Sequence, residues 1–498
     1  MADRPPWSAG MAETHSAVVF FVGDRAYKLK KPVDLGFLDF STLAARAAVC
    51  HREVELNRRL APDVYLGVAD VSDVDGQPCD HLVVMRRMPA DRRLSTLITD
   101  GAPVEDDLRR LARLVAAFHA RAERSPLADE QARVDATRAR WQANTDALVQ
   151  MQGLRGVGPG VEVIQGLADR YLDGRGPLLD RRISEGAALD GHGDLLADDI
   201  FCLDDGPRIL DCIEFDDQLR MGDRLADVAF LAMDLERLGR PDLAQLFLAT
   251  YREHADDRWP VSLAHHHIAY RAQVRAKVTA IRAEQRDGDH AGVAAEVSAL
   301  LQLANAHLEA GRVRLILVGG LPGTGKSTIA RAMGDALGAT VLSTDEIRKE
   351  QAGIPVDQPA PAAYGEGLYT EAGRAAVYET LLQRCRVAIG LGETVVLDAS
   401  WASAAWRARA REVATSGAAD VREVRCEAPR SLSAERLAAR AAVGGDPSDA
   451  TAEVALAMEG DASPWPEAAT LDTSGSVDAT VAAGLSAVTP PVNPFPLG

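Results

Sequence analysis

The sequence is poor in cysteine and aromatic residues, and it has no long apolar run. Its six cysteines form no C-x-x-C pair, which argues against metal fingers and a disulfide framework and favours a reducing compartment. No segment approaches the roughly 18 apolar residues of a membrane span, and the N-terminus lacks the charged-then-apolar order of a secretory signal. We therefore expect a cytoplasmic protein that does not contact a membrane.

Basic charge is also short. The 498 residues carry 55 Lys and Arg against 73 Asp and Glu, a formal charge of −18, which argues against binding to a nucleic-acid backbone. Arginine fills nearly every basic position, so each retained ammonium group is a candidate for a site that a planar guanidinium cannot serve. The lysines are Lys28, Lys30, Lys31, Lys277, Lys326 and Lys349.

The first 310 residues have the pattern of a small sheet followed by helices. Runs at 17–22 and 25–30 flank a Gly-Asp turn, which predicts a hairpin. Helical spacing follows at 42–60 and dominates from about 104 to 280, interrupted by a strand-like pair at 200–215. This order predicts an α+β domain over residues 1–310.

From Val313 short apolar runs alternate with helical segments, which is typical of a parallel α/β sheet. We assign residues 311–475 to this second domain. No Gly/Ser-rich linker precedes it, so we expect the two halves to dock. The Pro- and Ala-rich residues 476–498 are expected to form a poorly ordered tail.

The second domain opens with a G-x-x-x-x-G-K-S/T (Walker A) motif at 320–327, directly after an apolar strand and before a helical run. Glycines let backbone N–H groups surround phosphate oxygens, and the helix adds its positive N-terminal end. In this motif the lysine reaches the terminal phosphates of ATP and the serine binds Mg²⁺. The predicted phosphate-binding residues are Gly320, Gly323, Thr324, Gly325, Lys326, Ser327 and Thr328.

Five residues downstream, two aspartates and three arginines, are candidates for the same chemistry. Asp345 follows the second strand, where a carboxylate can accept a proton from a substrate hydroxyl, and Arg348 lies one helical turn further on. Asp398 ends another strand and could hold the Mg²⁺ shell through water. The alternative for either carboxylate is a helix N-cap. Arg436 and Arg440 share a helix face that could close over ATP, or that is simply solvated.

These motifs resemble the P-loop kinases grouped with polynucleotide kinase, zeta toxin and gluconate kinase, over residues 311–475. The resemblance implies that Asp345 is the base or substrate anchor and that lid arginines, Arg436 and Arg440 here, close on the phosphates.

A second motif runs from Gly191 to Ile200. It is similar to the H-G-D-x-x-x-x-N catalytic loop of aminoglycoside phosphotransferases and their protein-kinase relatives. The resemblance implies that Asp194 accepts the hydroxyl proton of the acceptor and that His192 braces the loop. Asp199 stands where the family has a metal-binding Asn, which adds a negative charge near the phosphates.

In the same family a metal-binding Asp ends the next strand. When the spacing is counted back from Asp223 and Asp227, the metal-binding position falls on Glu214, with Asp211 as the alternative. Either carboxylate could hold Mg²⁺. The resemblance covers residues 13–240.

The front hairpin supplies the expected ATP lysine. We prefer Lys28 to Lys30, because Lys28 puts a small alanine two residues earlier, where adenine would pack. Its expected partner on the following helix is Glu53, with Glu55 as the alternative. A Gly-rich loop of the protein-kinase type is missing, and Thr14-His15-Ser16 stands in its place.

The sequence thus predicts two fused kinase domains, each using ATP and Mg²⁺ to phosphorylate a hydroxyl of a small molecule such as a sugar, nucleoside or amino-alcohol. In the alternative, only the P-loop domain is an active kinase or ATPase, and the front domain is a degenerate nucleotide-binding regulator; the substitution at Asp199 and the Glu at 214 motivate it. A third hypothesis, polynucleotide end repair, needs a basic groove and conflicts with the charge of −18.

Overall fold

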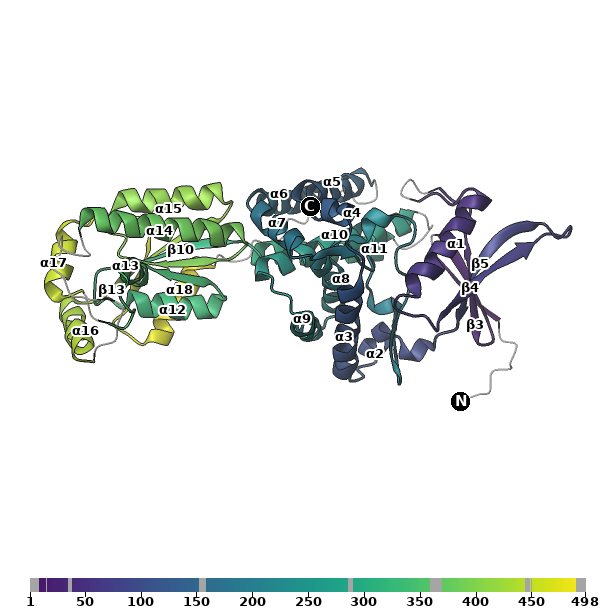
Figure 1. Cartoon of the computed structure of the whole chain (residues 1–498), viewed down its shortest axis with the longest axis horizontal. Coiled ribbons are helices and arrows are strands. Elements are labelled where there is room, and N and C mark those ends of the chain that lie inside the picture. Colours follow the sequence, from purple (N-terminus) through teal and green to yellow (C-terminus); the bar gives the residue numbers. More distant parts are fainter. Residues whose placement is uncertain are drawn as a thin grey trace.

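A computed structural model shows three parts along the longest axis of the molecule. From right to left in Figure 1 they are an N-terminal sheet, a helical middle part and a C-terminal α/β part. The structure describes residues 9–14, 16–34, 38–151, 158–284, 290–358, 370–443, 448 and 450–489.

The N-terminal sheet is antiparallel and is covered by one helix. Its strand order is β1 (Ala9–Glu13), β2 (Ala17–Val22), β3 (Arg25–Lys30), β5 (Pro78–Arg86) and β4 (Tyr65–Ser72). The hairpin predicted from the sequence is present as β2 and β3. Helix α1 (Leu43–Asn57) packs on β4 and β5, so that Cys50 and Val54 share a core with Val83. This packing places Glu53 of the helix beneath the sheet.

The middle part consists of helices around two short strand pairs. These pairs are β6 (Ala188–Asp190) with β9 (Met221–Asp223) and β7 (Ile200–Leu203) with β8 (Gly206–Ile209). The helices are α2 (Leu94–Thr99), α3 (Glu105–Arg121), α4 (Pro126–Ala132), α5 (Val134–Gln150), α6 (Gly158–Asp173), α7 (Gly176–Ser184), α8 (Arg224–Arg237), α9 (Pro241–His254), α10 (Val261–Glu284) and α11 (His290–Ala310). In the described part of the chain, no helix combines the length and apolar character that crossing a bilayer requires.

The C-terminal part is a parallel sheet with helices on both faces. Its strand order is β11 (Thr340–Ser343), β12 (Val395–Asp398), β10 (Arg314–Gly319), β13 (Asp420–Glu427) and β14 (Ala469–Asp472). In Figure 1, α14 (Glu371–Gly390) and α15 (Ala404–Ser416) lie on one face, and α12 (Lys326–Leu337) and α18 (Val477–Val488) on the other. The helices at the left end are α13 (Thr344–Gln351), α16 (Arg430–Val443) and α17 (Ala452–Gly460). The predicted fold class, a protein-kinase-like α+β domain followed by a P-loop α/β domain, is therefore confirmed.

The expectation of a poorly ordered tail from residue 476 is wrong for residues 477–488, which form α18. The hydroxyl of Ser476 caps this helix, and Leu485 and Val488 pack in the same apolar cluster as Met333 of α12. Alanine favours helices, and all the prolines of this segment follow Thr489. Residues 490–498 lie outside the described part.

The two halves share one apolar core, as the missing linker predicts. Leu263 of α10 and Leu308 of α11 belong to the same buried cluster as Leu315 of β10 and Ile389 of α14. A polar contact reinforces it, since the hydroxyl of Ser262 donates to the carbonyl oxygen of Gly392 at 2.6 Å. The halves are therefore continuous in packing, and neither presents a separate, closed core at this interface.

Arg175 is the main buried polar group of this interface. Its side chain is completely buried, and its guanidinium donates to the carbonyl oxygens of Ile389, Gly417 (3.0 Å) and Ala418 (3.3 Å) in the other half. We predict that Arg175→Ala lowers the free energy of unfolding by about 2–4 kcal/mol, because buried carbonyls lose their donor and a cavity forms. Urea unfolding of the full chain measures this loss. Arg133→Ala, which removes an exposed ion pair to Asp180, should change stability by less than about 0.5 kcal/mol.

Candidate active sites

The loop between β10 and α12 can approach a ligand with its backbone alone. Gly320 and Gly323 have φ angles of +143° and +83°, which residues with side chains rarely adopt. A Cβ atom at either position would lie 2.6 Å from a backbone carbonyl oxygen, that of Cys426 or of Ser433. Glycine is therefore required at both positions, and the loop leads directly into the N-terminus of α12, where N–H groups bind phosphate.

The other loop residues predicted to bind phosphate divide into two kinds. Lys326, Ser327 and Thr328 form the first turn of α12, with Gly325 as its N-cap. Thr324 is buried, and its hydroxyl donates to the carbonyl oxygen of Leu321 at 2.8 Å, so that its side chain holds the shape of the loop. The structure thus leaves the lysine and serine of the first turn to meet phosphate and metal.

Asp398 lies at the end of β12, beside this first turn. Ser327 lies close to its carboxylate, and Oδ1 is buried without a hydrogen-bond partner among the described residues. Burial raises the pKa of Asp398, against the opposing charge of Lys326. The N-cap of the next helix is Ser403, so Asp398 caps no helix. A serine hydroxyl beside a carboxylate with an unused oxygen fits Mg²⁺, which prefers such ligands.

Asp345 lies in the first turn of α13, which follows β11, the strand next to β12. The helix is capped by Ser343, which excludes the capping role that we considered for Asp345. Its carboxylate accepts a hydrogen bond from Arg348. Burial raises the pKa of Asp345, but Arg348 and Lys326 together outweigh it and hold this pKa below its ordinary value. The carboxylate is therefore ionised near neutral pH and close to the loop lysine.

Arg436 and Arg440 both lie on α16, as their spacing predicts, but they make different contacts. Arg436 donates to the carbonyl oxygen of Thr473 at 2.7 Å. Its Nη1 lies 3.6 Å from the point where a side chain at Gly325 would begin, so the guanidinium is beside the phosphate loop. Arg440 donates to the carbonyl oxygen of Ala450 at 2.8 Å. A cavity of about 490 Å³ lies between α16, α17 and the phosphate loop.

In the front domain, Lys28 of β3 lies between two carboxylates. Its Nζ is 2.9 Å from Oε1 of Glu53 on α1 and 2.5 Å from Oδ1 of Asp211, which follows β8. Glu55, the alternative partner, instead pairs with Arg52 at the surface. These contacts place Lys28 between the sheet and the helical part, as expected for a lysine that binds phosphates. In the segment 14–16, His15 lies outside the described residues.

The two carboxylates predicted for the metal position make different contacts. Glu214 is buried and forms an ion pair with Lys30, whose Nζ also lies 2.6 Å from Oε2 of Glu53. Asp211 is the half-exposed carboxylate, and its charge acts on Asp199 in the catalytic loop. Asp211 adopts a positive φ of 64°, a bend that spacing alone does not reveal. These contacts favour Asp211 over Glu214 as the metal-binding candidate.

The catalytic loop is held by Asp227 of α8, a role that the sequence did not indicate. Its carboxylate accepts the backbone N–H groups of His192 (2.7 Å) and Gly193 (2.8 Å), and it also contacts Nε2 of His119. His192 is buried with its Nε2 3.1 Å from the carbonyl oxygen of Leu210, and burial lowers its pKa to about 4. The neutral imidazole thus braces the loop, which presents Asp194.

Three carboxylates of the front site repel one another. Burial raises the pKa of Asp199 well above its ordinary value, and the charges of Asp211 and Asp194 raise it further. Within the described residues, no group of three His, Cys, Asp or Glu side chains is arranged to hold a metal ion alone. Mg²⁺ commonly takes one or two carboxylates and completes its shell with phosphate oxygens and water. Asp199 and Asp211 fit such a shared site.

This repulsion leads to a prediction for the metal-free protein. A carboxyl group with a raised pKa in the folded state destabilises the fold above its ordinary pKa of about 4 and has no effect in stronger acid. Asp199→Asn should therefore raise the melting temperature at pH 7, by about 1 °C for each kcal/mol by which it stabilises a fold of this length. The difference should disappear at pH 3, and the variant should bind nucleotide less tightly when Mg²⁺ is present. Thermal melts and calorimetry test the two halves of this prediction.

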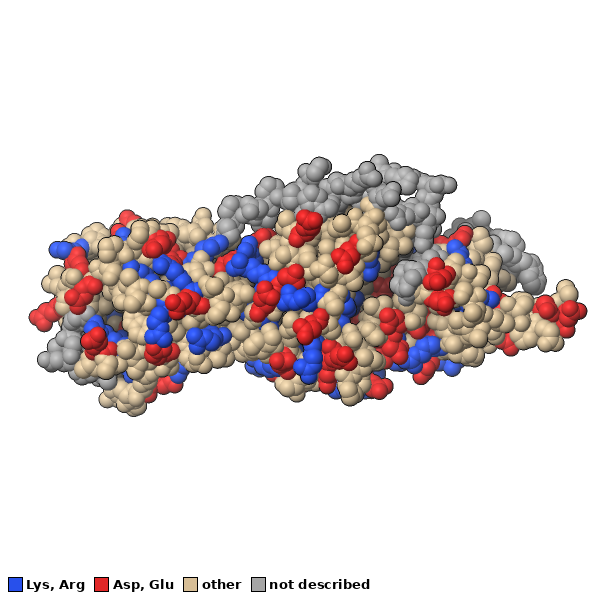
Figure 2. All heavy atoms as spheres, turned by 90° about the horizontal axis from the view of Figure 1, so that it is seen from above, with Lys and Arg blue, Asp and Glu red and all other residues tan. Residues whose placement is uncertain are grey.

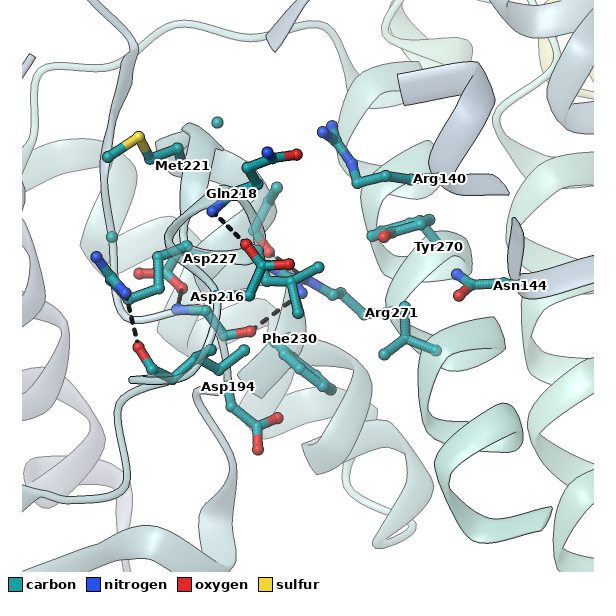
Figure 3. A pocket seen from close by; sticks show the side chains of 18 of the residues that line it. Arg140, Asn144, Asp194, Asp216, Gln218, Met221, Asp227, Phe230, Tyr270 and Arg271 are labelled. Carbon is teal, nitrogen blue, oxygen red and sulfur yellow. Dashed lines mark hydrogen bonds between the residues drawn. The ribbon is translucent and has the colours of Figure 1, made fainter. Parts of the chain in front are cut away.

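A cavity of about 700 Å³ adjoins Asp194. Figure 3 shows Asp194, Asp216 and Asp227 around it, with Arg140 on the far side and Arg271 reaching from α10 toward the catalytic loop. The arrangement can bind a triphosphate at the sheet and a second molecule in the cavity.

Comparison with known proteins gives one family model, described as an AAA domain, which matches residues 315–464. The "Uncharacterized protein Rv2004c" of Mycobacterium tuberculosis is 44% identical over 469 residues, which cover 94% of this chain and 93% of that protein. A gluconokinase structure from Sinorhizobium meliloti is 18% identical and covers 36% of this chain and 94% of its own, with a TM-score of 0.27.

A structure of a choline/ethanolamine kinase family protein from Mesorhizobium loti is 15% identical. It covers 60% of this chain and 91% of its own, with a TM-score of 0.37. The resemblance of the two halves to protein-kinase-like enzymes and P-loop kinases is confirmed at the level of fold.

Proposed function

This chain belongs to the same family as the mycobacterial protein Rv2004c, and on that premise we propose that it is a bifunctional ATP-dependent phosphotransferase. One observation carries the proposal: each half has its own lysine at the place where a triphosphate would lie. Lys28 contacts Glu53 and Asp211 in the front site, and Lys326 lies near Asp345 and Asp398 in the other.

In the front site, Lys28 binds the phosphates of ATP and Asp194 orients the hydroxyl of the acceptor. The acceptor oxygen forms a bond to the γ-phosphorus while the bond from the γ-phosphorus to the β,γ-bridging oxygen breaks. The hydroxyl proton passes to the Asp194 carboxylate, and ADP leaves. Asp199 and Asp211 would hold Mg²⁺, which neutralises charge on the phosphates when it is bound. Positioning and electrostatic stabilisation supply most of the rate in this chemistry.

In the P-loop site, the backbone of the loop and Lys326 hold the β- and γ-phosphates. Asp345, ionised and directed by Arg348, accepts the proton of the second acceptor hydroxyl. Ser327 and Asp398 would hold Mg²⁺. Arg436 lies beside Gly325 and contributes positive charge to the phosphates when nucleotide is bound.

The surface supports small-molecule acceptors rather than nucleic acid. On the face seen in Figure 2, basic and acidic side chains are interspersed, and the described residues form no continuous basic band there. Together with the charge of −18, this favours a soluble substrate for both sites and action in the cytoplasm.

Calorimetry on the full chain tests the proposal. Titration with Mg²⁺ and a non-hydrolysable ATP analogue should give two equivalents per chain. Lys326→Ala should weaken one of them and Lys28→Ala the other. Binding of a single equivalent of the analogue by the wild type, with no binding by Lys326→Ala, would support the alternative. In that case the front domain binds no nucleotide and only the P-loop domain is active.

A further inference from the structure

The cavity beside Asp194 has one strongly basic wall. Four cations line it: Arg140 from α5 and Arg271, Arg275 and Lys277 from α10. Figure 3 shows Arg140 and Arg271 with Tyr270 between them, and the Arg271 guanidinium reaches Gly193, the residue before Asp194. The basic wall, as we call these four residues, therefore lines the same cavity as the candidate catalytic carboxylate.

None of the four cations has a carboxylate partner in the described part of the chain. Arg271 donates to the carbonyl oxygens of Ala226 (2.9 Å) and Gly193 (3.1 Å), and the ring of Phe230 lies beneath it. The Nζ of Lys277 has Asn144 as its hydrogen-bond partner, at 2.6 Å.

The remaining two members are equally uncompensated. Arg140 donates to the side-chain and main-chain oxygens of Gln131, both at 2.7 Å. The Nε of Arg275 is buried and has no hydrogen-bond partner among the described atoms. Burial lowers the pKa of Arg140 and of Lys277, as expected where no anion offsets the cost. The basic wall thus holds four unpaired positive charges.

Two of the acidic residues that line the same cavity are held by other groups, and among the described residues no ion pair joins any acidic lining residue to the wall. Asp223 pairs with Arg182 at 2.7 Å, and Asp227 accepts the N–H groups of the catalytic loop. Asp216 accepts the backbone N–H of Gln218 at 2.9 Å. Burying a cation without a counter-charge costs folding free energy. An anionic group of a ligand that binds there offsets this desolvation free energy.

We propose that the acceptor of the front site is an anionic hydroxyl compound, a carboxylate or a phosphate ester. Its negative group binds the basic wall while its hydroxyl meets Asp194. This inference rests on the proposed phosphotransfer at Asp194, and it replaces the amino-alcohol acceptor that the sequence left open. It also gives a role to Lys277, one of the retained lysines that neither proposed nucleotide site uses.

A matched series of six-carbon polyols isolates the charge of the ligand. The probes are gluconate, sorbitol 6-phosphate, neutral sorbitol and cationic N-methylglucamine. Binding is measured by calorimetry on full-length Lys326→Ala protein with Mg²⁺ and a non-hydrolysable ATP analogue, which leaves the front site as the intact one. We expect at least one anion to bind tenfold or more tightly than sorbitol, and the two anions distinguish a carboxylate from a phosphate site.

Arg275→Gln and Lys277→Gln, added to this protein, should each weaken anion binding at least tenfold and leave sorbitol unchanged. Arg113→Gln, the same change at an exposed position of α3, is the matched control. Thermal melts check the fold, and loss of an unpaired cation should not lower the melting temperature. Equal binding of sorbitol and the anions, tighter binding of N-methylglucamine, or anion binding unaffected by both variants overturns the inference.

A second readout separates this inference from the proposed function. ADP release is measured with the same four probes. If anions bind through the basic wall and no probe is phosphorylated, the anion site stands and the front kinase proposal fails. If sorbitol or N-methylglucamine is phosphorylated and the anions are not, the kinase proposal stands and the anionic acceptor is wrong.

Discussion

Lys326→Ala should reduce phosphoryl transfer by the P-loop site about 10²–10³-fold while the front site keeps its rate. The ammonium group is the cation that the first turn of α12 brings to the terminal phosphates, and it stabilises the charge that develops on them. Its loss removes a preorganised electrostatic interaction in the transition state. Steady-state ADP release by the full chain, measured with an acceptor specific for this site, gives the ratio.

Two controls make the result specific. Lys31→Ala removes a lysine of the front sheet that pairs with Glu13, and it should leave the rate of the P-loop site within a factor of two. Lys326→Arg keeps the charge but replaces the compact ammonium group with a larger, planar guanidinium group. Its rate should therefore lie between those of Lys326→Ala and the wild type. An unchanged rate in Lys326→Ala would show that the loop does not serve phosphoryl transfer.

Asp194→Asn should reduce phosphoryl transfer by the front site about 10²–10⁴-fold, the usual contribution of a general base. The amide has the shape of the carboxylate but cannot accept the hydroxyl proton. Nucleotide affinity should change little, because Lys28, Glu53 and Asp211 form the phosphate end of the site. Calorimetry and ADP release on the same protein separate the two effects.

Asp204→Asn, a fully exposed carboxylate after β7, is the matched control for Asp194 and should be neutral. A bell-shaped or rising pH profile that flattens in Asp194→Asn would support its role as a base. If the front site has no turnover in the wild type, the regulatory alternative gains support. In that case Asp194→Asn should leave the rate of the P-loop site unchanged.

The P-loop site could be predicted almost completely from the sequence because its parts are local. The loop occupies consecutive residues between a strand and a helix, so glycine, lysine and serine positions follow from spacing alone. The front site is assembled from β3, α1 and two loops, over nearly two hundred residues. Order along the chain was enough to select Lys28 and Glu53, whereas the choice between Asp211 and Glu214 depended on a backbone bend.

Other features had no signal in the sequence. Asp227 holds the catalytic loop through two backbone N–H groups, a contact between α8 and a loop 34 and 35 residues earlier. The basic wall joins α5 to α10, and its meaning depends on which arginines lack carboxylates nearby. The alanines of α18 favour a helix, but its packing against α12 depends on the tertiary structure. Each of these features is a tertiary contact between segments whose own sequences contain no recognisable motif.

The apolar core that runs from α10 and α11 into β10 and α14 has a consequence for the separation of the two halves. A chain divided between Ala310 and Arg314 would expose an apolar surface on each fragment to water, so each fragment should fold less stably than the same residues in the full chain. Division of the gene at this point is therefore disfavoured by the cost in folding stability. The two candidate sites are kept in a fixed one-to-one ratio because the halves that carry them share this buried core.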